Sequence, residues 1–267
     1  VFLLRQQKVP SAEEEGVDLY EYSASSKLAL QLSPDLCQQL GGEDWLQTKV
    51  NEVRMDVAER LGVVIPNIEV LLTGKGDQYQ ITRYGATLAA AELRPGKVLA
   101  ISSTSERVAL DGENTQDPAY GLPAYWIDES QVADAKRYGY TLVSFETVLV
   151  THLSDLVRKN IGEFIDRAFV ESLLARARET SAPLVEEVVP TLVSVNGLIK
   201  ILRLMAEEGV PLRSFEQLLA YLSEAEQKEA EASQLYEIIR RRMASTLVEG
   251  AVVNGNLKVV ALAGDIE

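Results

Sequence analysis

Residues 117–126 read DPAYGLPAYW, and this stretch is the most informative part of the chain. Two prolines and a glycine shape its backbone, and two tyrosines and a tryptophan accompany them. Proline fixes the backbone angle φ, and aromatic side chains supply a large amphipathic surface. This composition therefore suits a rigid recognition surface better than a catalytic centre. The same aromatic residues could instead fill a corner between two subdomains, and composition alone gives both interpretations equal weight.

The size of the chain sets the number of domains to expect. Its 267 residues suffice for two domains of ordinary size or for several small subdomains. The hydrophobic share of 46% and the charged share of 25% are normal for a soluble globular protein. We find no apolar run long enough to span a bilayer and no signal peptide. Because the chain starts at Val1 without a methionine, we expect it to be part of something longer.

Charge and rare residues argue against several functional classes. The formal net charge of −14 makes a basic face for nucleic acid or anionic lipid unfavourable. Cys37 is the single cysteine, so no internal disulfide can form, which fits a reducing compartment. His152 is the single histidine, which argues against most histidine-based catalysis and most zinc sites.

The first part of the chain predicts a mixture of strands and helices. Apolar residues recur at helical spacing over 43–61, and Gly62 closes that helix. We expect strands at 28–32, 68–72, 79–85 and 97–101, with turns at 73–77 and 95–96. Residues 102–116 are polar and predict a loop.

The rest of the chain predicts mainly helices. Asp128 should cap a helix that ends at Gly139, and Ser144 should cap another after a short strand at 140–143. We expect one helix that carries Phe169 to Leu174, a second that begins near Pro183 and stops at Pro190, and a third that runs from Ser194 to Gly209. A fourth should start at a Ser214–Gln217 capping box, and a fifth should carry Leu235 to Met243. Residues 257–262 suggest one strand with no visible partner.

Motifs that could carry chemistry have simpler explanations. Gly74-Lys75-Gly76 lacks the spacing of a phosphate loop and predicts a hairpin turn. Nothing marks Cys37 as an activated nucleophile, and the paired glutamates suit the solvated faces of helices. The run Arg240-Arg241-Arg242 is a solvated helix face or, alternatively, a docking spot for an acidic neighbour. We expect no catalytic residue, no cofactor and no metal site.

Several blocks of the sequence resemble one family in order along the chain. The family is FHIPEP, the large export-gate proteins of flagellar and virulence type III secretion systems. The blocks are LGVVIP at 61–66, LRPG at 93–96, DPAYGLPAYWI at 117–127, GYTLV at 139–143, VLVTHL at 148–153, LVEEVVP at 184–190 and EGVPLRS at 208–214. Any one block is weak evidence, but the whole series in register is highly specific.

The resemblance implies an α+β cytoplasmic domain built from several subdomains. After a linker at 1–22, an α/β first subdomain would cover 23–95 and 145–164. A small α/β insertion would form the second subdomain at 96–144, and a helical third subdomain would cover 165–244. Family members continue further, so 245–267 would be the start of an incomplete fourth subdomain.

The same resemblance implies a role in protein export rather than an enzyme activity. Family members assemble through this domain into a ring, usually of nine subunits, on the cytoplasmic face of the bacterial inner membrane. The ring receives export chaperones with their cargo, passes substrates toward the channel and takes part in selecting them. The implied partners are other copies of the chain, chaperone–cargo complexes, the export ATPase complex and a substrate-switch protein. The membrane would be reached only through a region N-terminal to this one.

The family also implies a docking site. In its flagellar branch, an aspartate, an aromatic residue and a threonine form a dimple for chaperones, and these positions correspond to Asp117, Tyr120 and Thr151. The family aromatic is commonly phenylalanine, so the tyrosine hydroxyl changes the polarity of the pocket and leans the expectation toward a virulence system. An aromatic anchor beside a carboxylate suits the reception of an apolar segment.

Two other classes of protein were considered. One is a generic cytosolic oligomeric adaptor without a membrane parent, which an upstream multi-span region would exclude. The other is a hydrolase that uses buried carboxylates, which a cluster of carboxylates in one deep cleft would favour.

Overall fold

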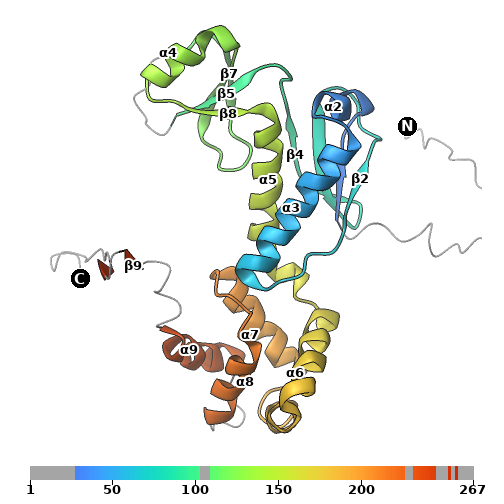
Figure 1. Cartoon of the computed structure of the whole chain (residues 1–267), viewed down its shortest axis with the longest axis vertical. Helices are drawn as coiled ribbons and strands as arrows, with labels where there is room; N and C mark the ends of the chain where they lie inside the picture. Colours follow the sequence, from blue (N-terminus) through green and yellow to red (C-terminus); the bar gives the residue numbers. More distant parts are fainter. Residues whose placement is uncertain (1–27, 103–108, 226–230, 245–251, 254–255, 258–267) are drawn as a thin grey trace, which may run out of the picture.

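The computed structural model describes residues 28–102, 109–225, 231–244, 252–253 and 256–257. These residues form an elongated molecule (Figure 1). Two β-sheets with their helices occupy one end, and a group of helices occupies the other. The fold class is thus mixed α+β, as the sequence predicts.

The first sheet has four strands in the order β2-β1-β3-β4. Their bounds are Leu28–Gln31 for β1, Ile68–Leu71 for β2, Gln78–Arg83 for β3 and Ala86–Glu92 for β4. Strand β1 pairs in parallel with β2 and antiparallel with β3. Helices α2 (Pro34–Gln39) and α3 (Glu43–Leu61) connect β1 to β2. Gly62 adopts a left-handed φ of 73° and ends α3, as predicted.

The strand order corrects the predicted hairpin at Gly74-Lys75-Gly76. Strands β2 and β3 flank this turn but do not pair, because β1 lies between them. The turn instead packs on the end of β1: the Gly74 amide donates to the Leu32 carbonyl oxygen at 2.9 Å. A Cβ atom at Gly74 would lie 2.6 Å from the Leu32 carbonyl carbon, so only glycine fits this approach. The sequence analysis also missed β4.

The second sheet is antiparallel and has the order β6-β7-β5-β8. Its strands are β5 (Val98–Ile101), β6 (Glu113–Gln116), β7 (Pro123–Ile127) and β8 (Thr141–Ser144). The strands predicted at 97–101 and 140–143 are therefore confirmed within a residue or so. The other two strands were not predicted: β6 lies where a loop was predicted at 102–116, and β7 includes the end of the aromatic segment at 117–126.

A short helical segment connects β7 to β8. It consists of a 3₁₀ turn, η1 (Glu129–Gln131), and helix α4 (Val132–Arg137), followed by Gly139 with a φ of 79°. Asp128 precedes this segment, but its side chain makes no capping hydrogen bond. The predicted helical segment is present with Asp128 at its N-cap position, but without the side-chain bond that the predicted cap would make.

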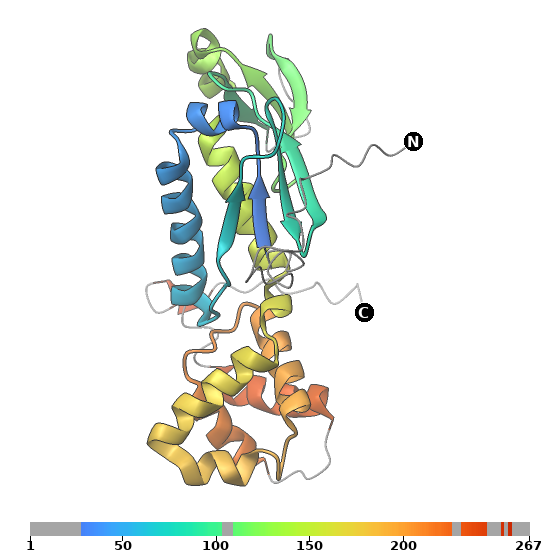
Figure 2. The same ribbon diagram turned by 90° about the vertical axis from the view of Figure 1, so that its right-hand side faces the viewer.

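Helix α5 (Phe145–Lys159) leads from the second sheet past the first sheet to the helical end (Figure 1). The Ser144 hydroxyl accepts a hydrogen bond from the Thr147 amide, so the predicted cap is confirmed. Helix α5 packs beside α3, against the first sheet (Figure 2). It buries one face: Val148, Leu149, His152, Leu153 and Val157.

The helical end contains η2 (Ile161–Phe164), α6 (Arg167–Val188), α7 (Val195–Glu207), α8 (Phe215–Glu224) and α9 (Ala232–Arg242). Helix α6 bends at Ser181, whose backbone is not helical, and this bend separates the two helices predicted there. The helix predicted from Ser194 to Gly209 is present as α7, and the Ser194 hydroxyl caps it by accepting from the Gly197 amide. The capping box predicted at Ser214 is wrong, because this residue lacks extended geometry and makes no side-chain cap. A capping box occurs instead at Glu231 and Gln234.

The chain end differs from the unpaired strand predicted at 257–262. Strands β9 (Val252–Val253) and β10 (Asn256–Leu257) pair antiparallel. Residues 258–262 lie outside the described residues, as does the linker predicted at 1–22. Among the described helices, none is both long and apolar enough to cross a membrane. The subdomain boundaries near residues 95, 144, 164 and 244 stay a prediction.

A single hydrophobic core continues from the first sheet through α5 into the helical end. The backbone also connects these parts, because the Leu212 amide donates to the Leu61 carbonyl oxygen at 2.7 Å. Gly62 lies at this junction, and a Cβ atom there would lie 3.0 Å from the Arg213 amide nitrogen. The end of α3 thus determines how closely the helical end approaches.

Replacing Gly62 by alanine tests this junction. We expect Gly62→Ala to lower the free energy of unfolding by about 2–3 kcal/mol, because it combines left-handed strain with contact against backbone. Gly209→Ala is a matched control: this glycine has a φ of 75° near the end of α7, and a Cβ atom there meets nothing within 4 Å. It should cost only about 1 kcal/mol. Equal urea midpoints for the two variants would contradict the proposed role of the junction.

Candidate protein-docking site

The predicted site begins at a tight turn between β6 and β7. Asp117 is 4% exposed, and its carboxylate oxygen Oδ2 accepts a hydrogen bond from the Tyr120 amide at 2.8 Å. The Gly121 amide donates to the Asp117 carbonyl oxygen, and the Asp117 amide donates to the Leu122 carbonyl oxygen, both at 2.8 Å. Gly121 has a φ of 69°, which glycine adopts without strain. These bonds fix the backbone of the turn from inside.

The fixed turn exposes an aromatic side chain. Tyr120 is 59% exposed, and Leu122 beside it is also exposed. Tyr120 and Thr151 line the same hollow, of about 270 Å³, although they come from the turn and from α5. The structure therefore brings together two of the three predicted site residues.

Asp117 takes a different place from the one that the resemblance implies. It does not line the hollow shared by Tyr120 and Thr151, and it lines a neighbouring one beside Arg94 and Glu113. Its carboxylate is engaged with the backbone of its own turn. Asp117 therefore stabilises the turn that carries Tyr120 and presents little of its charge to a partner.

Helix α3 supplies residues that the sequence analysis did not connect with the site. Glu52, Val53, Asp56 and Arg60 line the same hollow, together with Arg158 of α5. Asp56 forms an ion pair with Arg60 at 2.6 Å and lies 3.9 Å from Arg158. Helical spacing identifies the exposed face of α3, but it does not reveal that this face lies beside α5. The charges around the hollow are thus largely balanced among themselves.

A polar pair lies buried behind Thr151. His152 is 6% exposed and Tyr79 of β3 is fully buried, and the Tyr79 hydroxyl oxygen lies 2.6 Å from Nδ1 of His152. Burial lowers the pKa of His152 below its usual range. Burial, and next the charge of Asp117, raise the pKa of Tyr79. At neutral pH the phenol therefore keeps its proton and the imidazole is neutral, and in the tautomer with the hydrogen on Nε2 the Tyr79 hydroxyl donates a hydrogen bond to Nδ1.

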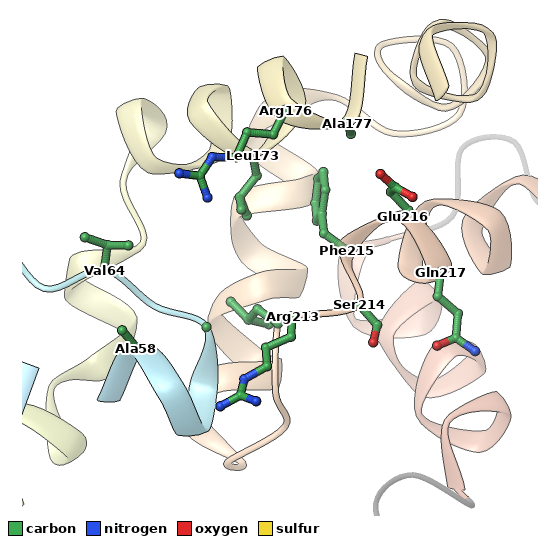
Figure 3. Close-up of a pocket in the computed structure, with 12 residues that line it drawn as sticks. Ala58, Val64, Leu173, Arg176, Ala177, Arg213, Ser214, Phe215, Glu216 and Gln217 are labelled. Atoms are coloured by element: carbon green, nitrogen blue, oxygen red, sulfur yellow. The ribbon is translucent and has the colours of Figure 1, made fainter. Parts of the chain in front are cut away.

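Other features of the described residues are a larger hollow, the arginine run and the acidic side chains. One hollow of about 750 Å³ lies where the end of α3 meets α6 and the start of α8, and Figure 3 shows Arg176, Arg213 and Phe215 around it. In the arginine run at 240–242, Arg240 pairs with Glu208 and Arg242 pairs with Glu224, which favours an internal role over docking. The described residues contain no group of three or more acidic, histidine or cysteine side chains suited to a metal ion. Asp117 is the only buried carboxylate that the described part of the chain contains.

The chain resembles curated flagellar proteins over most of its length. It is 29% identical over 238 residues to flagellar biosynthesis protein FlhA of Proteus mirabilis, and this aligned region covers 88% of this chain and 34% of that protein. It is 31% identical over 227 residues to the FlhA protein of Caulobacter vibrioides, covering 83% and 32%. The chain spans about a third of the length of these relatives.

Solved structures show the same fold. The Chlamydia pneumoniae CdsV protein matches with a TM-score of 0.70 at 23% identity, over 82% of this chain and 67% of that one. A chain in the structure of the Chlamydia pneumoniae CdsV and CdsO protein complex matches with a TM-score of 0.71 at 21% identity, over 86% of this chain and 69% of that one. Nonameric EPEC SctV-C matches with a TM-score of 0.68 at 17% identity, over 87% and 69%.

A family model matches nearly the whole chain. At such low identities the solved structures show the fold alone. The model of the FHIPEP family, however, matches residues 4–267, and it covers both the aromatic turn and α5. This chain belongs to the FHIPEP family.

Proposed function

We propose that this chain is the cytoplasmic, ring-forming part of a type III secretion export gate and that it receives chaperone–cargo complexes through the hollow between Tyr120 and Thr151. Family membership and the shared fold support the first half of this proposal. The geometry around Tyr120 supports the second half. Selection of substrates for export would follow from which complexes this surface accepts.

The observation that carries the docking proposal is the exposed Tyr120 on a fixed turn. Tyrosine supplies a large contact area with few rotatable bonds, and tyrosine is enriched at the energetic centres of protein interfaces. Because the Asp117 carboxylate fixes the Tyr120 backbone, little ordering entropy remains to be lost on binding. The surface is thus suited to an apolar segment of a protein partner.

Assembly into a ring is also part of the proposal. Nonameric structures are known for EPEC SctV-C and for the EscV cytosolic domain, which share this fold. We propose a homo-oligomeric ring of nine subunits for this chain as well. The CdsV and CdsO complex shows that a protein of this fold binds a second protein, which supports a further partner from the export ATPase complex. A substrate-switch protein completes the proposed set of partners.

Family membership also supports a proposal for where in the cell the ring lies. We propose the cytoplasmic face of the bacterial inner membrane, with the membrane reached through a part of the parent protein outside this chain. Family membership favours this proposal over a cytosolic adaptor without a membrane parent. A virulence rather than a flagellar system stays a prediction.

Truncating Tyr120 tests the docking site. We expect Tyr120→Ala to weaken binding of the cognate chaperone–cargo complex by about 30-fold, because an interface anchor is worth about 2 kcal/mol. Isothermal titration calorimetry with complexes from the same organism measures this loss. Tyr120→Phe should retain most of the affinity, since it keeps the ring and removes only the hydroxyl.

A matched control separates docking from general surface effects. Tyr138 is also an exposed tyrosine, 44% exposed, and it follows α4 in the second sheet's subdomain. Tyr138→Ala should leave affinity unchanged. Equal losses from Tyr120→Ala and Tyr138→Ala, or no loss from either, would contradict docking at Tyr120.

The net charge leads to a prediction for assembly. Each subunit carries a formal net charge of −14, so a ring brings many like charges together. Salt screens the repulsion between them, over a length of about 10 Å at 0.1 M. We expect the oligomer fraction to rise as NaCl increases from about 0.02 M to about 0.5 M. Sedimentation velocity at constant protein concentration measures this fraction, and an oligomer fraction that ignores salt would contradict the prediction.

A further inference from the structure

We infer that Tyr79 and His152 form a positioning pair that holds the two halves of the proposed docking site in register. The inference rests on the proposed function, because it concerns the surface formed by Tyr120 and Thr151. It adds two residues that touch no partner and act through α5 and the aromatic turn.

The pair holds α5 against the first sheet at the level of the site. His152 directly follows Thr151, and successive helical residues point about 100° apart. His152 therefore points inward while Thr151 lines the hollow. The bond from the Tyr79 hydroxyl, together with edge-to-face contact of the rings at 5.7 Å and 71°, fixes the rotation of α5. The rotation of α5 in turn decides where Thr151 points.

The other half of the site is connected to the same helix. The Lys159 ammonium group donates to the Ala119 carbonyl oxygen of the turn at 3.1 Å, and Asp155 holds Lys159 in an ion pair at 2.7 Å. Asp117 fixes the Tyr120 amide from the other side of the turn. A continuous set of contacts thus runs from Tyr79 through α5 to Tyr120.

A polar pair can specify the rotation of α5 more closely than an apolar pair would. The neighbouring buried positions of α5 are Val148, Leu149 and Leu153, whose apolar contacts carry no directional bond. A buried hydrogen bond is directional, and leaving either partner unsatisfied costs about 1–3 kcal/mol. The pair therefore adds a directional contact that specifies the rotation of α5 more closely than apolar packing alone.

The pair also makes the site sensitive to acid. Four ionisable groups surround the imidazole: Tyr79 on β3, Asp117 in the turn, and Asp155 and Lys159 on α5. Burial lowers the pKa of His152, so the unfolded chain takes up this proton more readily than the folded one. The stability that the neutral imidazole contributes is thus complete above about pH 6.5 and is lost as the pH falls through the folded pKa. A protonated Nδ1 no longer accepts from Tyr79.

Hydrogen exchange of the turn tests the inference without any partner. In Tyr79→Phe, which keeps the ring and removes the hydroxyl, we expect the amides of Tyr120 and Gly121 to exchange about tenfold faster than in the wild type. Tyr236→Phe is the matched control, because Tyr236 is a buried tyrosine of α9 in the helical end. It should leave exchange in the turn unchanged. Unchanged exchange in Tyr79→Phe, or an equal acceleration throughout the chain, would overturn the inference.

The pH profile provides a readout that a merely structural role would not change. After correction for intrinsic exchange rates, the wild-type turn should open more readily as the pH falls below about 6.5. His152→Gln keeps a hydrogen-bond acceptor that does not titrate, so it should flatten this profile while keeping the turn protected at neutral pH. A profile that stays as steep in His152→Gln would exclude His152 as its source.

Two further outcomes keep the test decisive. Should His152→Gln fail to fold, the ring ¹⁵N signals of wild-type His152 can be followed instead, and they must titrate together with the amide of Tyr120. Should exchange respond as expected while Tyr120→Ala still binds chaperone–cargo complexes, the positioning pair would stand and the docking proposal would fail.

Discussion

The burial of one face of α5 is the constraint on which the rest of the structure depends. Val148, Leu149, Leu153 and Val157 join a core that continues from the first sheet into the helical end. The start of α5 is fixed by Ser144 beside the second sheet, and its end leads directly into η2. This burial decides which face of α5 points inward, but hydrophobic contact is not directional and leaves the exact rotation of the helix less closely specified. The polar contacts of His152 and Lys159 supply that direction.

The proposed docking site divides its tasks among few residues. Tyr120 supplies exposed contact area, and Asp117 supplies backbone support from a buried position. The charged residues around the hollow pair with one another, as Asp56 does with Arg60. A partner would thus meet an aromatic anchor surrounded by balanced charges. Such a surface would depend on shape and apolar contact more than on net attraction.

Sequence patterns predicted the local features of this fold more successfully than its pairings. The helix at 43–61, its stop at Gly62 and the cap at Ser144 follow from neighbours in sequence and were confirmed. The supposed hairpin at Gly74 failed because its flanking strands pair with β1, a choice that only the assembled sheet reveals. Strand β4 was missed because it is rich in alanine, which is depleted in strands, and none of its residues is fully buried. The family resemblance predicted Asp117, Tyr120 and Thr151 as site residues, of which Tyr120 and Thr151 share a hollow and Asp117 does not line it. The contributions of α3 and Tyr79 could not be predicted, because they depend on contacts between distant segments.

The discontinuous make-up of the first sheet has a consequence for biosynthesis. Strands β1 to β4 are complete by Glu92, yet the helix that covers them beside α3 ends only at Lys159, after the whole second sheet. While a ribosome extends the chain through 98–144, the apolar face that α5 will cover stays exposed. Nascent chains add about 5–20 residues each second, so this interval lasts for seconds. Early folding of the second sheet would shorten the search by bringing the start of α5 close to its final place.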